Sequence, residues 1–220
     1  MNKIKHLILL IPIVFFISIA LNNTGSSAND TYSFKESDSC LNPLNSNVPM
    51  ANLTYNLMRV NFPNKDEISA YRLIKQVMDS AVFLSNKYTK APQKITVSYV
   101  TTKGVRADSG GSNGKIRFGP ERTYMNVGTA LHEISHIFGV GTSYKWISLM
   151  AVDAPTGKTI FKGKNATDML RQITGDKKAV IFMDNQHFWP YGLNYVSEYK
   201  TESDLINNCK IVNAMIKDGL

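Results

Sequence analysis

The chain has 220 residues and a net charge of +8, and hydrophobic residues make up 43% of it. This length is enough for one domain with a substantial core and too short for two comfortable ones. The basic residues are scattered, and aromatic residues do not alternate with basic clusters. A nucleic-acid partner is therefore not expected.

The N-terminus has the pattern of a secretory signal peptide. Lys3 and Lys5 precede an apolar stretch, Leu7–Leu21, and Ser26-Ser27-Ala28 follows as a small-residue cleavage site. The apolar stretch is shorter than the roughly 20 residues that a membrane-spanning helix needs. We therefore expect a signal peptide at residues 1–28, a mature domain at residues 29–220, a secreted or periplasmic location and no stable membrane association.

The two cysteines, Cys40 and Cys209, lie near opposite ends of the expected mature chain. An even number of cysteines in an exported protein favours a disulfide bond. In the chain-entropy model such a long loop contributes about 5 kcal/mol of stability. Two separate buried thiols are the alternative. Neither cysteine is close to a histidine in the sequence, which argues against a catalytic thiol.

The first half of the chain predicts one helix and two strands. Residues 29–64 are polar, with several prolines, and should wrap the surface irregularly. Apolar residues then recur at helical spacing from Ile68 to Leu84, which predicts a helix that ends by Tyr88. Residues 94–101 and 115–118 predict strands, and the glycine-rich segment 105–114 predicts a hairpin loop between them.

The second half is mainly helical. Asn126 or Thr129 can cap a helix that ends at Gly139 or Gly141. Residues 165–174 and 202–217 predict two further helices, and residues 179–183 an extended piece. This order favours an α+β domain with a small mixed sheet packed on the helix that begins near residue 126.

That helix contains the motif His132-Glu133-Ile134-Ser135-His136, the H-E-x-x-H pattern of zinc peptidases. On a helix, His136 lies only about 40° around the axis from His132, so both imidazoles project from one face with Glu133 beside them. The far side is apolar and can face the core through Leu131, Ile134 and Phe138. We predict a zinc ion on the two histidines and Glu133 as the base that activates a zinc-bound water.

A catalytic zinc ion normally has three protein ligands. Apart from His6 in the expected signal peptide, His187 is the one histidine left in the chain, and neutral imidazole suits zinc. Asp184, three residues earlier, can orient His187 or replace it as the ligand. The other carboxylates that stay open as ligands are Asp153, Asp168, Glu198 and Glu202.

Two segments carry a resemblance to a known family. Residues 130–143 with Trp146, and residues 184–195, resemble secreted bacterial zincin-type metallopeptidases, of the group that often carries a ricin-like lectin module. We do not expect that module in a chain of this length. The resemblance implies a zincin-like fold and zinc ligation by His132, His136 and His187, with Glu133 as the base.

The motif also resembles the longer signature of metzincins, H-E-x-x-H-x-x-G-x-x-H, but the position of that family's third ligand is occupied by Thr142. A neutral hydroxyl is a poor zinc ligand, so metzincin coordination is not expected.

Peptide hydrolysis also needs a group that stabilises the oxyanion. Tyr191 and Tyr195, close to His187 in the sequence, are the candidates, with Tyr144 as a third; the alternative is that all three are packing residues. An exposed sheet edge, at residues 115–118 or 123–125, could align a substrate strand.

We therefore expect a monomeric, secreted, zinc-dependent endopeptidase that acts on peptides or proteins. One alternative is a secreted binding protein whose zinc is structural or vestigial, but a structural site needs no base at position 133. The other is a non-peptidase zinc hydrolase such as a deformylase, which would need a cysteine ligand in a motif of its own, and Cys40 lies in no such motif.

Overall fold

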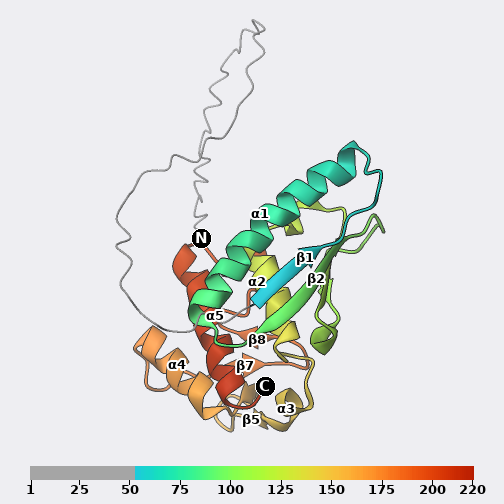
Figure 1. Ribbon diagram of the computed structural model, residues 1–220. Helices are drawn as coiled ribbons and strands as arrows, with labels where there is room; N and C mark the ends of the chain where they lie inside the picture. The colour runs from blue at the N-terminus through green and yellow to red at the C-terminus, as the bar shows by residue number, and fades with distance from the viewer. Residues whose placement is uncertain (1–52) are drawn as a thin grey trace, which may run out of the picture. The chain divides into compact units, whose positions relative to one another are not determined.

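Five α-helices and two four-stranded sheets make up residues 53–220, the part of the chain that the computed structural model describes (Figure 1). The domain is therefore mixed α and β, as the sequence predicts. The expected signal peptide and Cys40 lie outside these residues. Within them, no helix is both long and apolar enough to cross a membrane.

The first sheet has the strand order β1-β2-β4-β3. Its strands are β1 (Leu53–Leu57), β2 (Gln93–Tyr99), β3 (Ala107–Ser109) and β4 (Lys115–Phe118). β1, β2 and β4 run parallel, and β3 is antiparallel to β4. On one face the strands bury Ile95, Val97, Ile116 and Phe118, while Lys94, Thr96 and Arg117 are exposed on the other. This alternation means that one face of the sheet is covered and the other is open.

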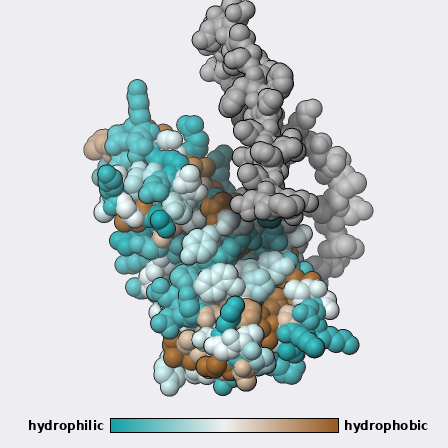
Figure 2. Space-filling view, turned by 180° about the vertical axis from the view of Figure 1, so that it is seen from behind, coloured by the Kyte–Doolittle hydropathy of each residue, from teal (hydrophilic) through white to brown (hydrophobic). Residues whose placement is uncertain are grey.

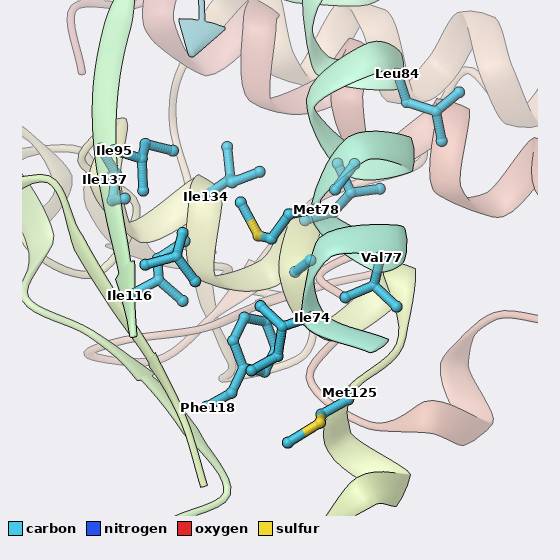
Figure 3. Close-up of a cluster of buried hydrophobic side chains, with 14 of the residues drawn as sticks. Ile74, Val77, Met78, Leu84, Ile95, Ile116, Phe118, Met125, Ile134 and Ile137 are labelled. Carbon is cyan, nitrogen blue, oxygen red and sulfur yellow. The ribbon is translucent and has the colours of Figure 1, made fainter. Parts of the chain in front are cut away.

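Two helices cover the buried face, α1 (Lys65–Tyr88) and α2 (Val127–Ile137). Ile95, Ile116 and Phe118 point from the strands toward side chains of both helices, including Ile74, Met78 and Ile134 (Figure 3). α1 begins at a capping box in which Asn64 and Glu67 bond each other's backbone N–H groups. The first hydrophobic cluster therefore lies between α1, α2 and the sheet.

Two predictions about this sheet are wrong. The strands at 94–101 and 115–118 do not form a hairpin, because β2 and β4 are parallel. The intervening segment contains β3, and the hairpin joins β3 to β4. A strand of three residues shows no alternation from which it could be recognised. β1 falls in the segment expected to be irregular, and it enters the sheet by pairing with β2.

The second sheet is antiparallel with the order β5-β6-β7-β8. Its strands are β5 (Met150–Val152), β6 (Thr159–Phe161), β7 (Phe182–Met183) and β8 (Phe188–Trp189). Of these four strands, the sequence predicts only β7, as part of the extended piece at residues 179–183. The helices around it are α3 (Tyr144–Ser148), α4 (Lys164–Thr174) and α5 (Glu202–Lys217). Together they bury a second hydrophobic cluster that includes Trp146, Phe161 and Phe188.

The two predicted C-terminal helices are confirmed as α4 and α5. α5 contacts α1 and α2 as well as α4, so it touches elements of both clusters. Cys209 of α5 is 2% exposed, and burial raises the pKa of its thiol to about 12. Its bond to Cys40 stays a prediction. The surface seen from behind is mostly hydrophilic, with its hydrophobic residues in separate patches (Figure 2).

Replacement of Phe118 by Ala should lower the free energy of unfolding by about 3–5 kcal/mol, because it leaves a cavity at a fully buried position. Urea denaturation measures the change. Phe83→Ala, at a side chain 63% exposed on α1, is the matched control and should cost less than about 1 kcal/mol. Equal losses in the two variants would contradict the proposed position of the core.

Candidate metal centre

Helix α2 presents its polar residues on one side. Asn126 caps the helix by accepting the N–H of Thr129 at 2.9 Å, which settles the choice between the two predicted caps. Ile134 and Leu131 are buried in the first cluster. His132 and Glu133 line a cleft on the opposite side. The helix therefore holds the motif in the register that its periodicity predicts.

His187 lies in the tight turn that joins β7 to β8. Asp184 begins the turn, and its Oδ1 accepts the backbone N–H groups of Gln186 (2.7 Å) and His187 (2.6 Å). Its other oxygen, Oδ2, lies 3.3 Å from Nδ1 of His187. Asp184 thus both shapes the turn and orients the imidazole, which is the supporting role expected for it.

The turn is held against the end of α2. Trp146 is fully buried and donates its Nε1–H to the carbonyl of Asp184 (3.2 Å). Gly141, just beyond α2, has a φ of 67°, and a Cβ there would lie 2.3 Å from the carbonyl oxygen of Gln186. Glycine is therefore required at this position both by its conformation and by the close approach of the turn.

Three histidines converge between these elements. Each offers a ring nitrogen, and the ligand atoms of His132, His136 and His187 all lie within 4.8 Å of one another. Nε2 of His132 and Nε2 of His136 are 3.1 Å apart. Two nitrogens bound to one tetrahedral zinc ion at about 2.0–2.1 Å would be about 3.3 Å apart. The cluster is therefore compact enough to hold a metal ion.

The hydrogen bonds of the first two rings decide which nitrogen is free. Nδ1 of His132 bonds the carbonyl oxygen of Gly192 (2.9 Å), and Nδ1 of His136 bonds that of Val140 (2.8 Å). A carbonyl oxygen only accepts, so both Nδ1 atoms carry the proton. In the neutral rings both Nε2 lone pairs then face each other. Two lone pairs that face each other repel, and a cation bound by both removes the repulsion. The two nitrogens therefore fit a metal ion.

Burial keeps these two rings neutral. It lowers the pKa of His132 to about 4, helped by the neighbouring His136, and it lowers the pKa of His136 as well. Metal ligation needs the neutral imidazole, so protons do not compete for these two ligands near neutral pH.

Glu133 lies beside the histidines and is 5% exposed. Burial, with a smaller contribution from Asp108, raises the pKa of its carboxyl group to about 8. A buried carboxyl with a raised pKa in a cleft is typical of a proton-transfer group. A bound dication would favour the charged form and lower this pKa.

A cleft of about 500 Å³ opens in front of Glu133. Residues from five parts of the chain line it: 106–107 where β3 begins, 123–124, α2, the turn between β7 and β8, and the segment that follows β8. His132 and His187 reach this cleft, while His136 lies behind them and lines a smaller hollow with the other two. The cleft therefore gives a ligand access to the histidine cluster.

Glu198 braces the segment that follows β8. Its carboxylate accepts hydrogen bonds from Nε1 of Trp189 (3.0 Å) and from the backbone N–H of Asn194 (3.1 Å). Gly192, whose carbonyl orients His132, lies between these two donors in the chain. Glu198 is therefore not placed as a ligand, and its contacts hold the segment that positions His132.

The other candidate carboxylates also lie outside the histidine cluster. Asp153 accepts hydrogen bonds from Thr156, Asp168 pairs with Lys164, and Glu202 is exposed in the first turn of α5. Among the described residues, only the three histidines form a group of three or more potential ligands that lie close enough to share an ion. Thr142, at the position of the third metzincin ligand, donates its hydroxyl to the carbonyl of His136 (2.7 Å), so its side chain closes the end of the helix and does not act as a ligand.

The tyrosine candidates separate by position. Tyr195 is 64% exposed and lines the cleft with Glu133 and His187. Tyr191 packs against the second hydrophobic cluster, and its carbonyl accepts a hydrogen bond from the buried Asn208. Tyr144 is 88% exposed on α3 and does not line the cleft. The geometry therefore favours Tyr195 among the three.

Several residues of the site carry no signal in the sequence. Arg106, Tyr124 and Tyr199 line the cleft, and the carbonyl of Gly192 orients a histidine. These positions belong to no motif and are brought together by packing.

No family model, curated protein or solved structure matches this chain. The geometry of the site therefore carries the functional conclusion.

His187→Ala should weaken zinc binding by at least about a hundredfold, because it removes one of three converging imidazoles. Zinc affinity is measured by competition with a chromophoric chelator. Asn185→Ala, at an exposed position in the same turn, is the control and should bind zinc like the wild type. Unchanged affinity in His187→Ala would mean that another group is the third ligand.

Proposed function

We propose that this protein is a secreted zinc-dependent endopeptidase with a zincin-like catalytic domain. The observation that carries the proposal is the convergence of three imidazoles beside a buried carboxyl, Glu133, where Glu133, His132 and His187 line one open cleft and His136 lies behind them. The motif on α2 and the segment around His187, which resemble zincin-type metallopeptidases in sequence, are the two parts that meet there.

The three histidines would hold the ion, and their Nδ1 contacts fix the rings in the orientation for it. When bound, zinc supplies a Lewis acid that polarises the scissile carbonyl and makes a water molecule more acidic. Glu133 takes a proton from the attacking water and passes it to the nitrogen of the leaving amine as the C–N bond breaks. Its buried position beside the histidines supports this role.

The edge of the first sheet supports a peptide substrate. The sequence predicts an exposed sheet edge at residues 115–118 or 123–125, and both predictions are wrong. β4 lies between β2 and β3 and is therefore not at an edge, and residues 122–124 form a 3₁₀ turn. β3 is one of the two edge strands, β1 being the other, and Ala107 at its start lines the cleft. An extended peptide that pairs with β3 would pass in front of Glu133.

Glu133→Gln should lower peptide cleavage by about 10²–10⁴-fold while zinc stays bound, because the amide keeps the shape of the side chain but cannot take the proton. Cleavage is followed with a quenched fluorescent peptide library, and zinc content by elemental analysis. Glu121→Gln, at an exposed loop position, is the charge-matched control.

If Glu133→Gln holds zinc and cuts as fast as the wild type, the proposed mechanism is wrong. A zinc-loaded wild type that cuts no peptide would instead favour a binding protein or a non-peptidase hydrolase.

Tyr195 is proposed to donate its hydroxyl to the oxyanion. Tyr195→Phe should then lower kcat by about 10²-fold with little change in KM, because the donor acts on charge that develops in the transition state. Tyr144→Phe removes the same atom from an exposed tyrosine outside the cleft and should leave the kinetics unchanged. Equal kinetics for the two variants would remove Tyr195 from the mechanism.

A further inference from the structure

The cleft contains one positively charged side chain that the proposed chemistry does not use. Among the described residues that line it, Arg106 is the only arginine or lysine, and Glu133 is the only carboxylate. The remaining lining residues are the two histidines, aromatic and small apolar groups, and neutral polar groups. The charge of Arg106 is therefore available to a ligand.

Arg106 has no carboxylate partner in the described part of the chain. Two neighbouring arginines do: Arg117 forms a bidentate pair with Asp108 (2.7 and 2.6 Å), and Arg122 pairs with Asp66 (2.6 Å). Asp108 is the acid closest to Arg106 in the sequence, and its two oxygens are already taken by Arg117. Arg106 is thus the unpaired member of this group of arginines.

The side chain of Arg106 is oriented despite its exposure. Its guanidinium carbon lies 5.1 Å from the centroid of the Tyr124 ring, in the range of a cation–π contact, and Tyr124 also lines the cleft. The backbone is held because the carbonyl of Arg106 accepts the N–H of Gly119 at 2.7 Å. A cation–π contact uses the face of the guanidinium and leaves its N–H donors free for a carboxylate.

The position of Arg106 relates it to a bound peptide. It immediately precedes β3, the edge strand along which the substrate is proposed to lie. A residue of the peptide a short distance from the scissile bond would then face the guanidinium. The fork of N–H donors matches the two oxygens of a carboxylate.

We propose that Arg106 makes this cleft selective for peptides that carry a carboxylate close to the bond that is cut. The carboxylate is that of an Asp or Glu side chain, which fits cleavage within a chain, or that of the peptide's own C-terminus, in which case the same site cuts close to the end of the peptide. This inference rests on the proposed peptidase function and names the substrate class for the same site.

The test compares four proteins, with Arg106→Lys as a fifth that controls for folding, on two peptide libraries. The proteins are the wild type, Arg106→Gln, Arg106→Glu and the control Arg72→Gln, which removes the same charge from an exposed position on α1 that does not line the cleft. One library has amidated C-termini and random internal Glu, Gln and Lys, and the other has free C-termini without internal acids. Mass spectrometry identifies the cut bonds and their rates.

The wild type should prefer a carboxylate at one position by about tenfold over the amide. Arg106→Gln should lose this preference, Arg106→Glu should prefer Lys at that position, and Arg72→Gln should behave like the wild type. Preference within the amidated library assigns the carboxylate to an internal side chain, and preference only in the free library assigns it to the C-terminus. Arg106→Lys, which keeps the charge, should retain part of the preference and controls for folding.

A wild type that cuts peptides without preference for a carboxylate overturns the inference and leaves the peptidase function intact, and so does a preference that survives in Arg106→Gln. A binding measurement tests the carboxylate selectivity separately from the peptidase function. Zinc-loaded Glu133→Gln should bind peptides with the carboxylate that the cleavage assay identifies, an internal Glu or a free C-terminus, about tenfold more tightly than their Gln or amidated counterparts, and the double variant with Arg106→Gln should bind both equally. Equal binding by Glu133→Gln itself counts against the inference, whatever the cleavage assay shows.

Discussion

The hydrogen bond from Nδ1 of His132 to the carbonyl of Gly192 joins the two halves of the candidate metal centre. It fixes the tautomer of a ring on α2, and its acceptor belongs to the segment that follows the His187 turn. The matching bond of His136 to Val140 closes the end of α2 in the same way. Because each Nδ1–H donates to a carbonyl oxygen, the Nε2 atom of each ring keeps a free lone pair that can bind an ion.

The site lies where the two hydrophobic clusters meet. Phe138, directly after α2, packs against both of them. The first cluster holds α2 on the sheet, and the second holds the β7–β8 turn through Trp146 and Phe188. The relative position of His132, His136 and His187 therefore depends on two cores at once.

The parts of the fold that the sequence predicts well are those with a long periodic pattern. α1 has 24 residues, with recurring apolar positions, an acidic first turn and a capping asparagine, and α5 has a similar pattern over 16 residues with a capping threonine. The strands of two or three residues, β3 and β5 to β8, are too short to show alternation, and they are defined by pairing with a neighbouring strand rather than by a pattern of their own. The sequence therefore does not reveal that β2 and β4 are parallel. The glycine-rich connection between them contains β3, which is too short to be recognised, and without β3 the connection looks like a hairpin loop.

The sequence by itself determined the pair of histidines with Glu133, because a spacing of four residues on a helix fixes their angular relation. It also reduced the third ligand to His187 and a few carboxylates. Only the tertiary structure brought His187, and none of these carboxylates, into one group with His132 and His136, and only it showed that Tyr195 reaches the cleft while Tyr191 does not and that Arg106 lines its wall. These relations come from contacts such as Gly141 with Gln186 and Trp146 with Asp184. Such contacts join residues far apart in the chain, and no local periodicity records them.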